Sequence, residues 1–370
     1  MGLGEGKSSP IPVTSLTETL LEKSVMCVWS AYAGKKEAAP LLLEALKKTE
    51  GYWAGFYTGI AVCSGNNKIN FAKCAGHTGV WEERFNVADL PGNTGIAHSR
   101  TNSGGDDKFA HPYVGTEGIV ALVSQGSVGI FGDEKPRYAE VGRRLFDQGR
   151  RMRSASTPSV TRPNPLFVMP DGKQLALSDI VVNEIESEYM KHGDMVKAMR
   201  AASGYMLEES SSMCIFADKP GVIGFINMNQ RVGYSFEEDG VYMGITQAGF
   251  PGSFTEIPGN SVGYVTADGV IHREALGDFK VNNTIPEKIA PAIVEVLRAE
   301  PGLLMGQICD KAVRPSGFDS SELNYHALAA YRALESLIAA GMVRYEVVDT
   351  VGGTGIPGRT FRWYLNEEKC

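Results

Sequence analysis

Cys27 is the residue of this chain whose type and surroundings best fit nucleophilic chemistry. It stands at the head of an apolar run, residues 28–32 (VWSAY), which has the character of a strand. A cysteine that begins a chain can use its own α-amine as a general base, because that amine has an ordinary pKa of about 7.7–8.0. Taken alone, Cys27 fits a plain buried thiol better than a catalyst.

The other five cysteines offer no competing chemistry. No pair has the C-x-x-C spacing of a zinc or redox site, and the cysteines are too scattered for a disulfide framework. We expect them to be core or surface thiols, and we predict neither a metal site nor a bound cofactor. They are Cys63, Cys74, Cys214, Cys309 and Cys370.

Six short segments accompany Cys27 in a fixed order. They are Met26-Cys27 before a strand and Gly34; Gly51-Tyr52 followed by 59–62 (GIAV); 95–100 (GIAHSR); 109–113 (FAHPY); 121–126 (ALVSQG); and Ser178-Asp179 followed by Glu184. From Cys27 to about residue 250 the chain resembles the glutaminase domain of glucosamine-6-phosphate synthase and related class II (N-terminal nucleophile) glutamine amidotransferases. Each segment is short, and the case rests on their order.

The resemblance assigns catalytic roles to three positions. Cys27 would attack the side-chain amide of glutamine and form a γ-glutamyl thioester. The backbone N–H of Gly126 and the side-chain amide of Gln125 would form the oxyanion hole. Gln125 stands where the family usually has Asn, and Val28 stands where it has Gly after the nucleophile.

The resemblance also implies how the substrate is held. Arg100 would clamp the substrate α-carboxylate with its bidentate guanidinium, and Asp179 would hold the α-ammonium. His98 and Thr101 flank Arg100 and join the substrate-binding candidates, although the mechanism requires no imidazole. The residues alone also allow Arg100 to be a surface arginine and Asp179 a residue placed by the helix dipole. Residues 101–104 (TNSG) replace the family's Trp-Ala-Thr-His.

The position of Cys27 within the chain leaves three alternatives open. Residues 1–26 are rich in Gly, Ser and Pro and are expected to be a leader or propeptide whose removal frees the amine of Cys27. Met26 could instead be the initiator. The third alternative is an uncleaved, inactive descendant that binds an amino acid and acts as a sensor.

The expected elements define an α+β fold. Residues 38–49 show helical periodicity, and short strand-like runs at 55–62, 69–74, 94–99 and 119–124 follow. Helices at 179–191 and 195–202 precede strands at 212–217, 222–227 and 241–245. Together with the resemblance, this order predicts a four-layer αββα sandwich of the N-terminal nucleophile hydrolase type over residues 27–283. A basic, Ser/Pro-rich stretch at 143–163 is expected to be a solvated excursion, with a phosphate or acidic-partner contact as the alternative.

Residues 284–370 are expected to form a winged-helix-like domain. Helices are predicted at 286–299, 304–312 and 325–340, and strands at 342–348 and 359–365. From residue 285 onward this part has nine Lys/Arg against eleven Asp/Glu, so it lacks the basic footprint of a DNA-reading domain. Charge therefore favours a protein-interaction or dimerisation role. Arg344, Arg359 and Arg362 in the wing keep DNA contact open.

Composition places limits on partners and location. The net charge of −7 gives no general attraction to nucleic acid or anionic membranes. No apolar run approaches the roughly 20 residues that span a bilayer, and the N-terminus lacks the features of a secretory signal. We expect a cytoplasmic protein, glutamine or a related amide as substrate, an ammonia-accepting partner protein and a homo-oligomer. The favoured function is amide hydrolysis, with the amino-acid-binding sensor as the rival.

Overall fold

The computed structural model describes most of the chain after residue 26. The described residues are 27–52, 54–102, 104–126, 131–156, 167–169, 171–204, 206, 210–277, 287–316, 326–352 and 355–366. The expected leader, residues 1–26, lies outside them, as do residues 157–163 of the basic stretch. No helix among the described residues is long and apolar enough to cross a membrane.

The first sheet has seven antiparallel strands in the order β13-β11-β12-β1-β4-β2-β3. They are β1 (Val28–Gly34), β2 (Tyr57–Cys63), β3 (Ile69–Ala75), β4 (Thr94–Arg100), β11 (Gly233–Glu237), β12 (Gly240–Gly244) and β13 (Thr255–Glu256). Nearly every residue of β1, β2 and β4 is buried, because both faces of these central strands are covered. The sequences of β1 and β2 are accordingly runs of mostly apolar and small residues rather than alternating ones.

The second sheet has six antiparallel strands in the order β15-β14-β10-β9-β6-β5. They are β5 (Tyr113–Val114), β6 (Val120–Gly126), β9 (Ser210–Phe216), β10 (Val222–Asn227), β14 (Ser261–Thr266) and β15 (Ile271–Ala275). It packs face to face against the first sheet, with β9 and β10 lying over β4 and β1. A separate short pair joins β7 (Phe167–Val168) and β8 (Gln174–Leu175).

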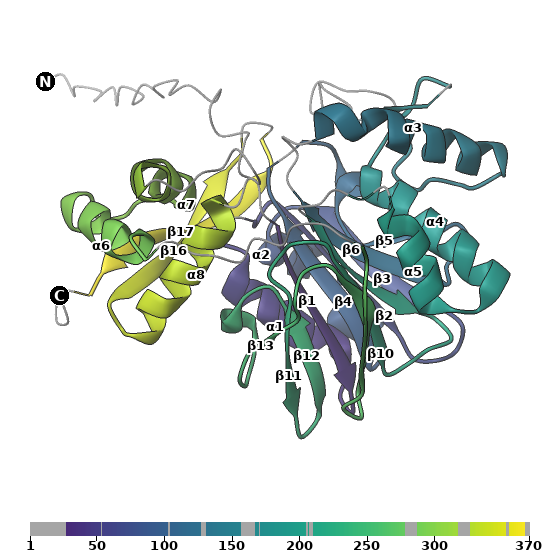
Figure 1. Ribbon diagram of the computed structural model, residues 1–370, viewed down its shortest axis with the longest axis horizontal. Coiled ribbons are helices and arrows are strands. Elements are labelled where there is room, and N and C mark those ends of the chain that lie inside the picture. The colour runs from purple at the N-terminus through teal and green to yellow at the C-terminus, as the bar shows by residue number, and fades with distance from the viewer. Residues whose placement is uncertain are drawn as a thin grey trace, which may run out of the picture.

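Helices cover the two outer faces (Figure 1). Helix α1 (Ala38–Thr49) packs on β1, β4 and β2, and α2 (Thr78–Arg84) lies beside β2 and β3. On the opposite side α4 (Leu177–His192) and α5 (Met195–Ser203) cover the second sheet, and α3 (Phe131–Asp147) packs on α4. The layers are therefore helix, sheet, sheet and helix, as the sequence predicted.

The part of the chain after residue 286 forms a second unit beside the sandwich (Figure 1). It contains α6 (Ile289–Ala299), α7 (Met305–Ile308) with a π-helical turn at Cys309–Val313, α8 (His326–Ala339), β16 (Val343–Val351) and β17 (Pro357–Leu365). The two strands form a two-stranded sheet, and Trp363 of β17 also makes an isolated antiparallel bridge with Leu303. The order of three helices and a hairpin agrees with the expected elements, and the winged-helix assignment itself stays a prediction.

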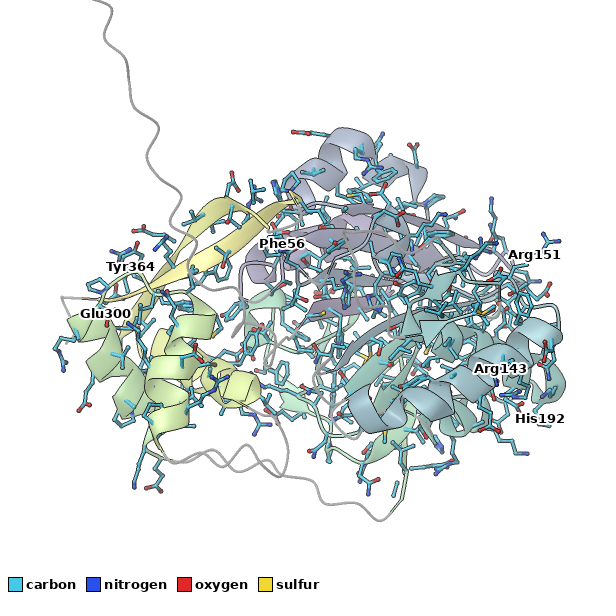
Figure 2. The ribbon with its side chains drawn as sticks, turned by 90° about the horizontal axis from the view of Figure 1, so that it is seen from above. Phe56, Arg143, Arg151, His192, Glu300 and Tyr364 are labelled. Carbon is cyan, nitrogen blue, oxygen red and sulfur yellow. The ribbon has the colours of Figure 1, made fainter. Side chains whose placement is uncertain are left out.

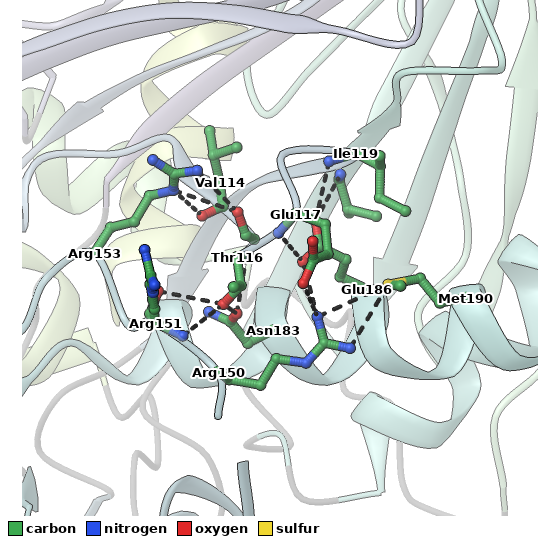
Figure 3. A network of polar contacts seen from close by, with 12 residues as sticks. Val114, Thr116, Glu117, Ile119, Arg150, Arg151, Arg153, Asn183, Glu186 and Met190 are labelled. Carbon is green, nitrogen blue, oxygen red and sulfur yellow. Dashed lines mark hydrogen bonds and ion pairs between the residues drawn. The ribbon is translucent and has the colours of Figure 1, made fainter. Parts of the chain in front are cut away.

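The basic stretch after residue 143 differs in part from the expected solvated excursion. Residues 143–147 are the end of α3, and the segment beyond them is tied to the turn between β5 and β6 (Figure 3). Arg153 donates to the carbonyl of Val114 at 2.9 Å, and Arg150 pairs with the fully buried Glu186 at 3.3 Å. Glu186 also accepts the backbone amide of Glu117 at 2.8 Å. Arg150 and Arg153 therefore make contacts within the protein.

Candidate active site

The register between β1 and β4 places Cys27 beside the expected substrate-binding residues. Trp29 is paired with His98, so Cys27, two residues earlier, lies opposite Arg100. Residues that are opposite on neighbouring strands, or two apart on one strand, point to the same face. The indole Nε1 of Trp29 reaches Ser211 of the second sheet at 3.3 Å. This face therefore looks into the gap between the two sheets.

Cys27 is buried in that gap, with 7% of its surface exposed. Burial raises the pKa of its thiol, because the thiolate loses its hydration. The Thr101 backbone amide, followed by the positive charge of Arg100, acts in the opposite direction on that pKa. The structure thus brings Thr101 and Arg100 to the sulfur. The resting group is the neutral thiol, and a nearby base is needed to activate it.

Arg100 is buried rather than on the surface, since only 6% of the residue is exposed. Its guanidinium lies 3.9 Å from the ring centre of Tyr57, its neighbour on β2. Two of its nitrogens donate to the carbonyls of Gly104 and Phe109. Its buried Nε has no hydrogen-bond partner among the described residues. The expectation that Arg100 belongs to a site thus has a geometric basis, and a donor remains for a carboxylate.

Gln125 faces the same gap from the second sheet. It is paired with Ser211, the residue that Trp29 contacts from the first sheet. It is 4% exposed, and neither its side-chain oxygen nor its nitrogen has a hydrogen-bond partner among the described residues. A buried amide left unpaired costs about 1–3 kcal/mol, which a bound polar ligand would recover. Gly126 follows at the end of β6 and is half-buried.

His98 is fully buried between the sheets. Its Nε2 lies 3.2 Å from the carbonyl of Ser124, and its ring stacks near that of His111, with centroids 4.0 Å apart. Burial first, and the charge of Arg100 second, lower the pKa of His98 to about 3. The imidazole is therefore neutral at physiological pH, which fits a positioning role rather than proton transfer.

Asp179 lies in the first turn of α4 and is fully buried. One oxygen accepts the backbone amide and the hydroxyl of Ser154, both at 2.7 Å. The other accepts the side-chain amide of Asn183 at 3.1 Å. Burial raises the pKa of Asp179, and the Ser154 hydrogen bonds partly offset this shift. The structure pairs Asp179 with these neighbours and shows no hydrogen bond to Arg100.

Lys73 lies within electrostatic range of both Arg100 and Asp179. The sequence did not indicate it as a site residue. Its ammonium donates to the carbonyls of Lys108, Ala110 and Pro112 at 3.1, 2.7 and 3.2 Å. Burial lowers its pKa to about 8, while the charge of Asp179 raises that pKa and the charge of Arg100 lowers it. The only sequence signal was a lysine within a mostly apolar strand, residues 69–75 (INFAKCA). No three His, Cys, Asp or Glu side chains of the described residues are grouped as metal ligands would be.

Comparison with known proteins finds relatives named glutamine–fructose-6-phosphate aminotransferase. The glutamine–fructose-6-phosphate aminotransferase of Clostridium acetobutylicum is 28% identical over 207 residues, which are 54% of this chain and 32% of that protein. The enzyme of the same name from Clostridium tetani is 30% identical over 166 residues, 44% of this chain and 26% of that protein. The chain thus spans no more than about a third of the length of these relatives. No family model matches the chain.

A solved structure shares the fold. Glutamine phosphoribosylpyrophosphate amidotransferase from B. subtilis superposes with a TM-score of 0.55 at 13% identity, over 89% of this chain and 68% of that one. The sequence relatives and this likeness of fold agree with the order of motifs. The chain is therefore related to the class II glutamine amidotransferases, and the resemblance seen in the sequence is confirmed.

Proposed function

We propose that this chain hydrolyses the side-chain amide of glutamine, or of a closely related amide, through a thioester on Cys27. One observation carries the proposal. Arg100 Nε and both amide atoms of Gln125 are buried polar groups without hydrogen-bond partners among the described residues, and they face the same gap as the thiol. These are the groups that an amino-acid amide would satisfy.

The reaction follows from these positions. The sulfur of Cys27 bonds to the amide carbon, and the thiol proton passes to a base, for which we propose the α-amine of residue 27 once it is free. The carbonyl oxygen becomes an oxyanion that accepts from Gln125 and the Gly126 N–H. The C–N bond then breaks, and ammonia leaves with the returned proton. Water hydrolyses the thioester and yields glutamate.

Substrate selection would rest on the two ends of the amino acid. Arg100 has a donor for the α-carboxylate, and Thr101 and His98 would line the pocket beside it. Asp179 would take the α-ammonium, because a carboxylate has about four acceptor sites and can hold more than its Ser154 and Asn183 contacts. We further propose that the ammonia goes to a separate acceptor protein, and that the unit after residue 284 has a winged-helix fold.

Covalent labelling tests this function. Incubation with 6-diazo-5-oxo-norleucine, a reactive glutamine analogue, is expected to add one label at Cys27, and glutamine should protect against it. Cys27→Ala should abolish the label, whereas Cys63→Ala, which removes another buried strand cysteine, should not. Intact-mass measurement of the purified protein establishes whether residue 27 is the first residue. Label on any other cysteine, or none on a chain that begins at residue 27, contradicts the proposal.

The burial of the thiol also supports a second candidate, an inactive amino-acid-binding sensor. In that case the chain keeps residues 1–26, takes no label and still binds glutamine, as isothermal titration would detect. Arg100→Met should abolish that binding, since the carboxylate would lose its cation. Turnover of glutamine would exclude the sensor.

A further inference from the structure

The two units of the protein are joined by backbone hydrogen bonds. The amide of Phe361 on β17 donates to the carbonyl of Gly51 at 2.8 Å, and the amide of Arg359 donates to that of Gly55 at 3.0 Å. The accepting loop follows α1 and carries the Gly51-Tyr52 segment that resembles the amidotransferases. Figure 2 shows Phe56, at the end of this loop, where the two units meet.

Glycines make this close approach feasible. A Cβ on Gly51 would collide with the ring of Phe361, and one on Gly55 with the carbonyl of Arg359. On the other side, a Cβ on Gly358 would collide with the ring of Phe56. Glycine is the only residue that fits such a contact between backbones. Both units therefore carry glycines where their backbones meet.

An aromatic cluster fills the space behind the backbone contact. Tyr52 stacks on Tyr331 of α8, with ring centroids 5.1 Å apart. It also lies 5.2 Å from Phe361 and 5.3 Å from Trp363 between ring centroids. All four residues are at most 2% exposed. Burial on this scale is typical of a fixed interface rather than a transient one.

Ion pairs from charged residues of α8 also attach this helix to the first unit. Glu335 of α8 pairs with Arg231 and also accepts the backbone amide of Gln247 at 3.0 Å. Arg332 pairs with Glu256 at 2.8 Å. These two charged residues of the expected recognition helix thus bind the amidotransferase-like unit. A helix that reads nucleic acid must present its polar face to solvent.

The arginines of the wing are also used within the protein. Arg359 pairs with Glu50 at 3.1 Å, Arg362 donates to the carbonyl of Gly302 at 2.9 Å, and Arg344 pairs with Glu346 at 2.7 Å. The sequence left these three arginines available for DNA. In the structure each of them contacts another group of the same chain. The interface with the first unit accounts for the surface of α8 better than a nucleic-acid partner does.

Tyr331 brings this interface to the candidate nucleophile. The loop that β17 holds also reaches β4, because the amide of Phe56 donates to the carbonyl of Arg100 at 3.1 Å, and Arg100 lies opposite Cys27. Tyr331, which stacks on Tyr52 of this loop, is 2% exposed and lies within electrostatic range of Cys27, 304 positions away. We propose that the C-terminal unit is a permanently docked wall of the candidate active site, and that Tyr331 is the positioning residue that it places beside Cys27. The inference rests on the proposed function for the identity of the substrate, but not for the position of the wall.

The wall is tested by the accessibility of the thiol in the full chain. Iodoacetamide, which is small and neutral, alkylates Cys27 whether or not the protein turns over glutamine. Tyr331→Ala should raise the alkylation rate of Cys27 by at least about ten-fold, since the thiol gains exposure. Tyr331→Phe keeps the ring and should leave the rate near that of the wild type. Hydrogen exchange of residues 357–365 should stay slow in both variants.

A second variant separates the effect of docking the whole C-terminal unit from the effect of the Tyr331 side chain. Gly51→Ala should loosen the contact with Phe361, so that hydrogen exchange of 357–365 and alkylation of Cys27 both become faster. In an active protein, Tyr331→Ala should raise the KM for glutamine several-fold with little change in kcat, and Tyr331→Phe should restore it. Unchanged alkylation in both Tyr331→Ala and Gly51→Ala overturns the inference. Faster alkylation in a chain that neither takes the glutamine analogue nor hydrolyses glutamine upholds the wall and rejects the proposed function.

Discussion

Glu50, at the end of α1, forms an ion pair with Arg359 of β17, with 3.1 Å between the carboxylate oxygen and the guanidinium nitrogen. Glu50 is fully buried, and it also accepts the backbone amide and the hydroxyl of Thr78 at 2.9 and 2.8 Å. The pair joins residues 309 positions apart and closes the interface between the two units. It makes the stability of the first unit depend on a residue of the second.

Loss of this cation should destabilise the whole protein. Arg359→Met leaves the Glu50 carboxylate buried without its counter-charge, which typically costs about 3–5 kcal/mol. Arg344→Met is the control, because its pair with Glu346 is half-exposed and contributes little to stability. Urea unfolding of the two variants, followed by tryptophan fluorescence, measures the difference. Equal free energies of unfolding would show that Glu50 does not depend on Arg359.

The neutral state of His98 predicts a dependence of stability on pH. Its pKa is lowered to about 3 in the folded protein, against about 6.5 in an unfolded chain. The unfolded state therefore binds a proton first as the pH falls. The stability that this residue contributes is complete above about pH 6.5 and is lost progressively toward pH 3, by at most roughly 1.4 kcal/mol for each pH unit.

Replacement of the imidazole should remove that slope. The free energy of unfolding of the wild type should fall more steeply between pH 7 and pH 5 than that of His98→Gln. Parallel profiles for the wild type and His98→Gln would mean that folding does not lower the pKa of His98.

Gln125 should act on the transition state rather than on substrate binding. Gln125→Leu removes the proposed oxyanion donor, and it should lower the rate of thioester formation by roughly 100–1,000-fold with little change in KM. Gln148→Leu, at an exposed position after α3, is the control. Single-turnover release of ammonia from glutamine gives the rate. A rate close to that of the wild type would assign the oxyanion to other donors.

Much of the framework was predictable from the sequence. The expected helix at 38–49 has the bounds of α1, because its apolar residues recur at helical spacing on the side that contacts β1 and β4. Strands β11, β14 and β15 were missed. β15 is an exposed edge strand that includes His272, Arg273 and Glu274, so it lacks the apolar character of a strand.

Contacts between distant segments were beyond sequence reasoning. The motifs indicated Cys27 and Arg100, since each has a local signature and β1 and β4 are paired through a regular register. The sequence positions of Tyr331 and Lys73 do not indicate which residues they contact. Lys73 meets carbonyls supplied by a loop, and Tyr331 meets Tyr52 only through the docking of one unit on the other. Such positions follow from packing and not from periodicity.

Lys73 should act through the segment that holds Arg100. Its ammonium ties together the carbonyls of residues 108–112, and Phe109 in the same segment accepts from Arg100. Lys73→Met keeps the aliphatic stem but frees these carbonyls, so Arg100 should lose its fixed position. We expect the KM for glutamine to rise about ten-fold, which corresponds to roughly 1.4 kcal/mol of binding energy. Lys68→Met, on an exposed turn, should leave KM unchanged.

Asp179 offers a test that separates substrate binding from structure. Asp179→Asn weakens the contacts with Ser154 and should cost about 1–3 kcal/mol of stability whatever the role of this residue. If Asp179 also holds the substrate α-ammonium, glutamine should lose much more affinity than an analogue that lacks the α-amine. Isothermal titration of both ligands against Cys27→Ala, with and without Asp179→Asn, measures this difference. An equal loss for the two ligands would leave Asp179 only its contacts with Ser154 and Asn183, and the ammonium would need another acceptor.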